Sequence, residues 1–343
     1  MRCMIPISPW AGNASPRTAG HRPPRPRWGR RPLACIPNER SPGACRPDCP
    51  ARYAVASFTQ QPSRYPLNRL LSCLAWAGFV AVAPLAACTP NYTFVTPAFS
   101  SCPAGAVGPS RLRVASYNLK SGLETNLDQV ADAIGEISPD VIGLQEVDHF
   151  VHRTGNVDQA KVLADRFGYQ EIFAGAIDRG GGAYGIALLT RLPIESASRI
   201  DLQATGTYEP RVAIDARVCV GPQALRVVTT HADVIAATAN VATLASRIAG
   251  GVGRGLIFMG DLNEGPTGGG PKSMVRTGMV DVIGLKAEGI TFWPNKSRID
   301  YLFVDPPLRE HVVSAAIDQN KASDHYPVYA DFDFSSGWTA QQM

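Results

Sequence analysis

The stretch LIFMGDLNEGP (residues 256–266) is apolar in its first half and then changes to small and polar residues. The apolar half is typical of a buried strand. Gly260 and Gly265 predict backbone turns after that strand. Asp261 and Asn263 lie between the two glycines, which leaves two interpretations open. They are either ordinary turn residues or two oxygen-bearing side chains held where a buried strand ends.

Similar short apolar runs recur from residue 111 onward. Their length and β-branched content are typical of strands, and several alternate between apolar and polar residues, as expected for sheets with one covered face. They predict strands over residues 112–118, 141–145, 185–190, 212–220, 225–231, 255–260, 298–304 and 326–332.

Three stretches between these strands have helical spacing. The first follows a cap at Thr125 or Asn126, carries an apolar stripe over 127–137 and is followed by Pro139. The others cover residues 158–167 and 236–250, while two glycine-rich segments, 178–185 and 266–274, are predicted as loops. Strands outnumber helices, so we expect two packed sheets with helices outside.

Acidic, amide and imidazole side chains recur at the ends of the predicted strands. Each has an ordinary structural explanation when taken alone, such as a turn residue, a surface charge or a satisfied histidine. Their repetition at six strand ends is less expected on structural grounds, because rigid sites are normally built at such positions. The residues are Asn118, Glu146, His231, Asp261, Asn263, Asp300, Asp324 and His325.

An ordered set of motifs resembles the endonuclease/exonuclease/phosphatase superfamily, the deoxyribonuclease I-like metal-dependent phosphoesterases. The motifs are SYNLKSG (116–122), DVIGLQEVD (140–148), YGIALLTRLPI (184–194), EPR (209–211), TTHAD (229–233), FMGDLNEGP (258–266), RIDYLFV (298–304) and ASDHYPV (322–328). The resemblance implies an α+β fold. This is a four-layer α/β/β/α sandwich of two mostly antiparallel sheets packed face to face, with helices outside.

The resemblance also implies a metal-assisted hydrolase. Phosphoester hydrolysis needs a hard cation and a proton acceptor, so Mg²⁺, or alternatively Mn²⁺ or Ca²⁺, is the expected cofactor. The implied metal ligands are Asn118, Glu146 and Asp324, with the Asp261 and Asn263 pair as the alternative that completes or replaces the set. The implied catalytic residues are His325 as a base oriented by Asp300, His231 as a donor to the phosphate, and Asp261 with Asn263 to position water. Arg153 and Arg211 are predicted to contact the substrate phosphate, with surface salt bridges as the alternative.

The first part of the chain has a different composition. Residues 1–110 carry twelve Lys or Arg against two acids, whereas residues 111–343 carry twenty-one against twenty-seven. Residues 1–66 are rich in Pro and Arg and lack periodicity, so they are predicted to be a disordered extension or to lie outside the mature protein. A basic nucleic-acid-binding tail is the functional alternative.

Residues 67–88 have the order of a secretory signal: Arg69, an apolar run and then small residues. The sequence LAAC ending at Cys88 resembles the lipobox of bacterial lipoproteins, which predicts a lipid anchor at this cysteine. A simple secretory signal and a retained transmembrane helix are the alternatives. Residues 89–110 are predicted as a linker, 111–334 as the catalytic domain and 335–343 as a tail.

These features predict an exported monomeric enzyme, in the bacterial periplasm or on the outer membrane, or alternatively secreted. Its substrate is expected to be a phosphoester from nucleic acid, a phospholipid head group or a small phosphodiester. The acidic balance of residues 111–343 disfavours a nonspecific nuclease, which needs a basic track. A noncatalytic binding protein on the same scaffold is the alternative of another class. Cys102 and Cys219 either pair in an oxidising compartment or remain free thiols.

Overall fold

The computed structural model describes residues 93–202, 209–287 and 289–338. The predicted extension, the signal segment and Cys88 therefore lie outside the described residues. Within the described part, no helix is long and apolar enough to span a membrane.

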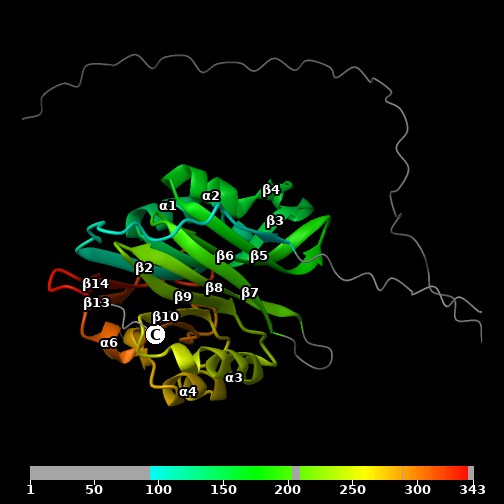
Figure 1. Ribbon diagram of the computed structural model, residues 1–343. Coiled ribbons are helices and arrows are strands. Elements are labelled where there is room, and N and C mark those ends of the chain that lie inside the picture. Colours follow the sequence, from blue (N-terminus) through cyan, green and yellow to red (C-terminus); the bar gives the residue numbers. More distant parts are fainter. Residues whose placement is uncertain (1–92, 203–208, 288, 339–343) are drawn as a thin grey trace, which may run out of the picture. The chain divides into compact units, whose positions relative to one another are not determined.

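Two sheets form the centre of the molecule (Figure 1). Within the described residues, the first sheet has eight strands in the order β1-β5-β6-β3-β2-β14-β13, with β4 paired to β3. Its strands are β1 (Phe94–Val95), β2 (Arg111–Asn118), β3 (Val141–Val151), β4 (Val157–Asp158), β5 (Gln170–Arg179), β6 (Gly182–Thr190), β13 (Val312–Ile317) and β14 (Val328–Asp333).

The second sheet has six strands within the described residues, in the order β11-β12-β10-β9-β8-β7. They are β7 (Ile194–Leu202), β8 (Arg211–Val220), β9 (Gln223–His231), β10 (Leu256–Asp261), β11 (Val280–Asp281) and β12 (Asp300–Val304). β2 pairs with β3 in parallel and β9 with β10 in parallel, while the other pairs are antiparallel. The mostly antiparallel arrangement is as predicted.

Helices cover the outer faces of both sheets (Figure 1). α1 (Leu127–Ile137) and α2 (Gln159–Phe167) pack on the first sheet, and α3 (Ala237–Ile248) and α4 (Gly269–Arg276) pack on the second. α5 (Val282–Lys286) and α6 (Pro306–Arg309) are short, and three 3-10 turns cover Lys120–Gly122, His152–Thr154 and Ala249–Gly251. The four-layer α/β/β/α sandwich is confirmed, and the segment predicted as a loop over 266–274 contains most of α4.

Three apolar cores correspond to these layers. One lies between the sheets, one between the first sheet and α1 with α2, and one between the second sheet and its helices. α1 begins as predicted, because the side chain of Asn126 accepts a hydrogen bond from the backbone N–H of Gln129. Its buried positions Val130, Ile134 and Ile137 form the stripe that faces the sheet.

The two sheets approach closely between the first half of β3 and the end of β9. Gly143 permits this approach, since a Cβ there would lie 2.4 Å from Thr229 Oγ1. Gln145 donates a hydrogen bond from Nε2 to Thr229 Oγ1 at 3.3 Å, and Ser116 lies on its other side at 3.2 Å. All of these groups are buried, so polar contacts as well as apolar packing join the sheets here.

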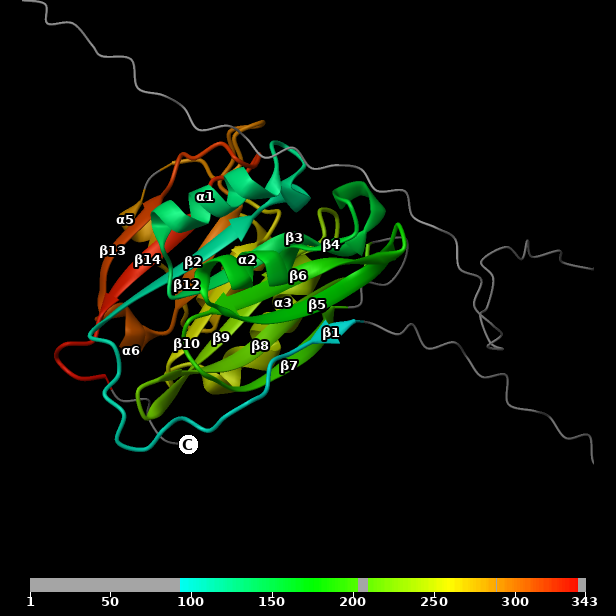
Figure 2. The ribbon, with the colours of Figure 1, turned by 90° about the horizontal axis from the view of Figure 1, so that it is seen from above.

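The described part of the predicted linker, residues 93–110, is attached to both sheets. β1 pairs with β5 of the first sheet, and the backbone N–H of Ser100 donates to Ile194 O of the second. Cys102 forms a disulfide with Cys219 in β8. Figure 2 shows this cyan segment running from β1 along the edge of the sandwich to β2.

We predict that removing the disulfide destabilises the domain. The bond joins residues 117 positions apart, so it constrains a long loop in the unfolded chain and contributes about 2–4 kcal/mol. Chemical denaturation with and without a thiol reductant measures this loss. A double Cys102→Ser, Cys219→Ser variant should be as unstable as the reduced protein and insensitive to reductant. Equal stability of the oxidised protein and the variant would show that the bond contributes nothing.

The Arg113–Asp331 pair between β2 and β14 predicts a pH dependence of stability. Burial alone would raise the pKa of Asp331, but hydrogen bonds from Arg113 and Ser314 outweigh it and lower the pKa. The stabilisation is therefore present above the ordinary Asp pKa of about 4 and is lost as pH falls through the lower folded value.

Asp331→Asn should lower the free energy of unfolding at pH 7 by about 1 kcal/mol, since the pair is partly exposed, and should make that free energy fall less steeply below about pH 4. Urea denaturation across this pH range is the measurement. Asp178→Asn is the control, because this exposed carboxylate has no salt bridge among the described residues. Identical pH profiles for the protein and Asp331→Asn would contradict the prediction.

Candidate active site

The predicted site residues meet at one end of the sandwich. β2, β9 and β10 end there, and β12 and β14 run antiparallel to their neighbours and begin there. β3, predicted to end before Glu146, instead passes through this region and continues to Val151. In the second sheet Asp261 is paired with His231 on one side and with Asp300 on the other. The strand register alone therefore places these three side chains together.

Asp261 is the centre of this group. It is fully buried, and its Oδ2 lies 3.6 Å from Nε2 of His231 and 3.6 Å from Nε2 of His325. Its Oδ1 accepts a hydrogen bond from the backbone N–H of Asn263 at 2.8 Å. Asn263 has a φ of 51°, a left-handed conformation that Asn tolerates. The turn interpretation of GDLN is thus correct, and the same turn fixes the carboxylate.

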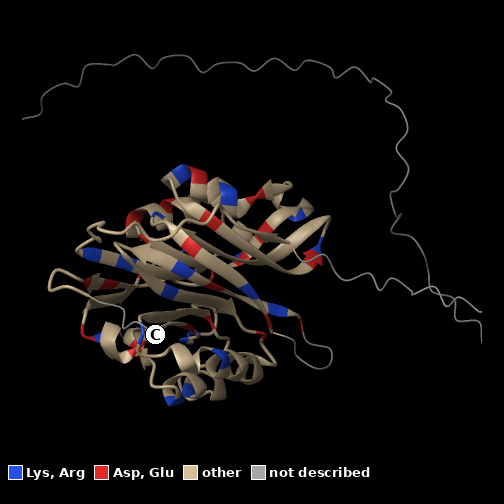
Figure 3. Cartoon of the chain, viewed as in Figure 1, with Lys and Arg blue, Asp and Glu red and all other residues tan. Residues whose placement is uncertain are grey.

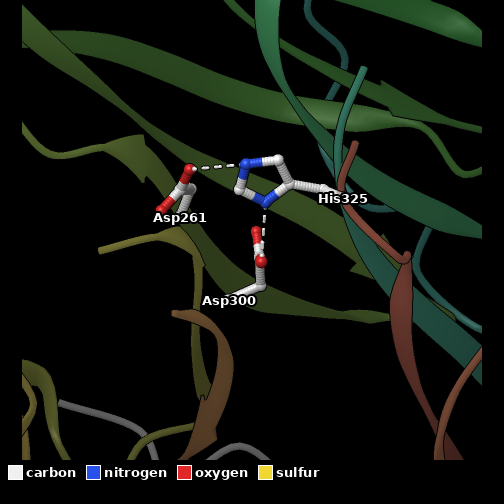
Figure 4. A group of neighbouring side chains, drawn as sticks. All are labelled: Asp261, Asp300 and His325. Carbon is white, nitrogen blue, oxygen red and sulfur yellow. Dashed lines mark hydrogen bonds and ion pairs between the residues drawn. The ribbon is translucent and has the colours of Figure 1, made fainter. Parts of the chain in front are cut away.

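His325 lies between two carboxylates (Figure 4). Its Nδ1 is 2.9 Å from Asp300 Oδ2, and its ring packs against Phe292 with centroids 4.7 Å apart. Burial alone would lower the pKa of His325, but the negative charges of Asp300 and Asp261 outweigh it and raise the pKa to about 10. The predicted pairing of His325 with Asp300 is present, with Nδ1–H donating and Nε2 directed toward Asp261.

Excess negative charge makes the cluster suitable for a cation. Asp261, Asp300 and His325 each offer a ligand atom, and these atoms lie within 4.8 Å of one another. Asp300 Oδ1 is buried without a hydrogen-bond partner among the described residues. Burial and repulsion from Asp300 raise the pKa of Asp261 to about 7, which a nearby divalent cation would offset. Because Asp300 and His325 are paired with each other, Asp261 is the member of this cluster whose carboxylate can face a hard divalent cation.

Asn118 holds two carboxylates from different strands. Its Nδ2 donates to Asp261 Oδ2 at 3.0 Å and to Glu146 Oε1 at 3.2 Å. Its Oδ1 accepts the backbone N–H of Lys120 at 3.0 Å. In these contacts the amide oxygen faces the backbone and the nitrogen faces the carboxylates, and the role of Asn118 as a metal ligand stays a prediction.

Glu146 occupies a bulge in β3. The pairing with β6 shifts register between Gln145 and Val147, and Glu146 has a φ of 58°. A non-glycine residue in this region is strained, and such bulges often redirect a side chain at a functional site. Ser121 Oγ donates to the backbone oxygen of Glu146 at 2.9 Å and supports this conformation.

Asp324, the third predicted metal ligand, has other partners. Its Oδ2 forms an ion pair of 2.8 Å with Lys120 Nζ, and its Oδ1 accepts from Ser323 Oγ at 3.2 Å. No hydrogen bond or ion pair joins Asp324 to Asn118 or Glu146 in the described structure. The role of Asp324 as a third metal ligand stays a prediction.

The two arginines predicted to bind phosphate are also engaged. Arg153 binds Asp148 through Nε and Nη2 at 2.8 Å each and donates to Ser121 Oγ. The salt bridge holds Arg153 against the fully buried Asp148 of β3. The hydrogen bond to Ser121 then connects Arg153 to the turn after β2. Arg211 is buried and contacts His231 Nδ1 at 2.9 Å and Glu209 at 3.0 Å. Arg153 therefore pairs with a buried carboxylate and not in the surface salt bridge given as the alternative, and phosphate binding by either arginine stays a prediction.

Sequence reasoning missed several residues that shape the site. Phe292 contacts a predicted site residue but lies in no quoted motif, whereas Lys120 and Glu209 contact such residues and lie inside the motifs SYNLKSG and EPR. Asp148 and Ser121 lie inside the quoted motifs QEVD and SYNLKSG, so their motif membership was the available signal. Their partners are distant in sequence and only the fold brings them together.

A family model described as the endonuclease/exonuclease/phosphatase family matches residues 115–325. The chain belongs to this family. Its members are phosphoesterase hydrolases that use divalent metals. The match includes every site residue discussed above.

Solved structures agree in fold. An endonuclease/exonuclease/phosphatase from Beutenbergia cavernae DSM 12333 is 19% identical with a TM-score of 0.55, covering 66% of this chain and 72% of its own. A family protein from Bacteroides vulgatus is 20% identical with a TM-score of 0.54, covering 66% and 99%. TDP2 from Caenorhabditis elegans is 19% identical with a TM-score of 0.51, covering 65% and 74%. The comparison with curated proteins found no match.

Proposed function

We propose that this protein is an exported phosphodiesterase that requires a divalent cation. The observation that carries the proposal is Asp261, a buried carboxylate with the Nε2 atoms of two histidines each 3.6 Å from one of its oxygens. A structural carboxylate needs no such surroundings, whereas a phosphoryl group in hydrolysis needs donors, a proton acceptor and compensation of its charge.

Glu146 and Asp261 are the residues that would hold the cation, since Asn118 fixes both carboxylates from one amide. A bound Mg²⁺ or Mn²⁺ would neutralise charge on the phosphoryl oxygens. The carboxylate of Asp324 is not required in this arrangement, because Lys120 already compensates its charge.

The chain's own residues supply positioning and proton transfer. A water beside Asp261 and Asn263 attacks the phosphorus in line with the leaving oxygen. The bond between phosphorus and that oxygen breaks, and the leaving oxygen keeps the electron pair and takes a proton from solvent. His325 Nε2 accepts the proton of the water, because Nδ1 is committed to Asp300. With the cation absent, its raised pKa keeps the ring protonated at neutral pH, so the ring must lose a proton before it can act. His231 donates to a phosphoryl oxygen.

The charge distribution favours a small phosphodiester or a phospholipid head group over bulk nucleic acid. Basic and acidic positions are interspersed over both sheets and the outer helices in the view of Figure 3. Residues 111–343 also carry more acids than bases. A nonspecific nuclease would instead need a continuous basic track for phosphate backbones.

Export is supported by the disulfide between Cys102 and Cys219, since such bonds persist mainly in oxidising compartments. The proposed signal and the LAAC sequence at Cys88 point to the same location. Membrane attachment through acyl chains on Cys88 would leave the folded domain free in the extracytoplasmic space.

Hydrolysis of bis(4-nitrophenyl) phosphate tests the activity. The purified protein should release nitrophenol with Mg²⁺ or Mn²⁺ and lose this activity in chelator, with recovery on adding metal. His325→Ala should lower kcat by about 100- to 10,000-fold, because it removes the proton acceptor. His311→Ala is the matched control, since His311 contacts Asp333 and Phe334 and no site residue in the described structure. Activity that persists in chelator would refute the metal requirement.

Lipidation is tested by growing bacterial cells that express the full chain with a labelled fatty acid. The label should enter the protein and be lost in Cys88→Ser, because only the lipobox cysteine is acylated. Cys73→Ser, in the same apolar segment, should keep the label. Equal labelling of Cys88→Ser and the unaltered protein would rule out the anchor.

A further inference from the structure

Arg211 and His231 form an unusual pair beside the reaction centre. Arg211 Nη1 lies 2.9 Å from His231 Nδ1, and both residues are buried. A guanidinium has only donors and does not lose its proton in proteins. His231 Nδ1 must therefore present its lone pair to Arg211, and the ring's single proton in the neutral state lies on Nε2.

The charge around His231 favours the same state. A proton on Nδ1 would place two donors 2.9 Å apart, and a doubly protonated ring would also lie buried against the fixed positive charge of Arg211. His231 is thus a neutral ring whose Nε2–H points toward Asp261 Oδ2, 3.6 Å away.

Asn263 offers a competing donor, since its Nδ2 lies 3.1 Å from His231 Nε2 and 2.9 Å from Ala232 O. A neutral imidazole cannot accept at both nitrogens. The guanidinium of Arg211 has only donors and must meet a lone pair, whereas the amide of Asn263 already donates to Ala232 O and so leaves Nε2 free to carry the proton. Arg211 consequently decides which nitrogen of His231 carries the proton.

Arg211 is itself held in place. Its Nη2 forms an ion pair of 3.0 Å with Glu209, which lies two residues before Arg211 in the chain. Nη1 is therefore directed at His231, and both terminal nitrogens of the guanidinium already have partners. The contacts match those of a residue that acts through another side chain.

We propose that Arg211 is a positioning residue that locks His231 in the Nε2–H form, a permanent hydrogen-bond donor to the substrate's phosphoryl oxygen. This inference rests on the proposed phosphodiesterase function. It replaces the expectation that Arg211 binds the phosphate itself. His325 has the opposite partner, the carboxylate of Asp300, so the two rings have different tasks around one carboxylate.

Nitrogen NMR of the full chain with ¹⁵N-labelled histidine tests the tautomer directly. His231 should show a protonated Nε2 and an unprotonated Nδ1. Arg211→Met, which keeps bulk but removes the donors, should give a mixture of tautomers, and Arg211→Lys should restore the Nε2–H form. Arg179→Met is the control, because Arg179 shares Glu209 but has no contact with His231. A proton on Nδ1 of His231 in the unaltered protein would overturn the proposal.

Kinetics with bis(4-nitrophenyl) phosphate and Mg²⁺ separate positioning from direct binding. Arg211→Met should lower kcat by about 10- to 100-fold with little change in KM, because a donor to the transition state becomes misdirected. In a His231→Gln background the same substitution should cause no further loss. Losses that multiply in the double variant, or a change confined to KM, would show that Arg211 contacts the phosphate independently and would overturn the inference.

The two proposals fail in different ways. The tautomer measurement requires no turnover, so an Nε2–H ring without hydrolysis of any phosphodiester would refute the function and support the Arg211 pairing. Hydrolysis by a protein whose His231 carries its proton on Nδ1 would support the function and refute the pairing.

Discussion

The hydrogen bond from Asn118 to Asp261 joins the ends of the two sheets, and the geometry of the site depends on it. Asn118 ends β2 in the first sheet, and Asp261 ends β10 in the second. The direction of the amide is set by the backbone N–H of Lys120, which requires the amide oxygen and so turns the nitrogen toward the carboxylates. A side chain buried at this depth must satisfy its hydrogen bonds, so a local turn in one sheet determines the position of a carboxylate in the other.

The sequence predicted the strands whose cores are apolar and whose ends carry motifs, such as β10 and β12, because burial on both faces leaves a continuous apolar run. It missed β7, in which only Ile194, Ile200 and Leu202 are buried and no regular alternation marks a strand. It also assigned the residues of α4 to a loop, because glycine and proline disfavour helix formation. The helix forms nevertheless, because it packs against α3. Such elements depend on tertiary contacts more than on their own residues.

The site was predicted as a set of residues but not as a set of contacts. Strand ends and motifs placed Asp261, Asp300 and both histidines correctly in one group. They could not show that Asp324 pairs with Lys120, residues separated by about two hundred positions, or which end of the Asn118 amide faces the carboxylates. Those choices depend on which donor lies nearest after folding, and residue type alone allows several answers.

His325 is paired with a carboxylate and His231 with a guanidinium, and this difference determines the net charge of the cluster. If His231 were positively charged, it would compete with a bound cation for the carboxylate oxygens of Asp261. If His231 were instead paired with a carboxylate, as His325 is, that carboxylate would add negative charge to the cluster. Arg211 avoids both, because its charge is offset by Glu209 outside the cluster and its donor keeps His231 neutral. The negative charge at Asp261, Asp300 and Glu146 then remains available for a cation, and His231 contributes a hydrogen bond without contributing charge.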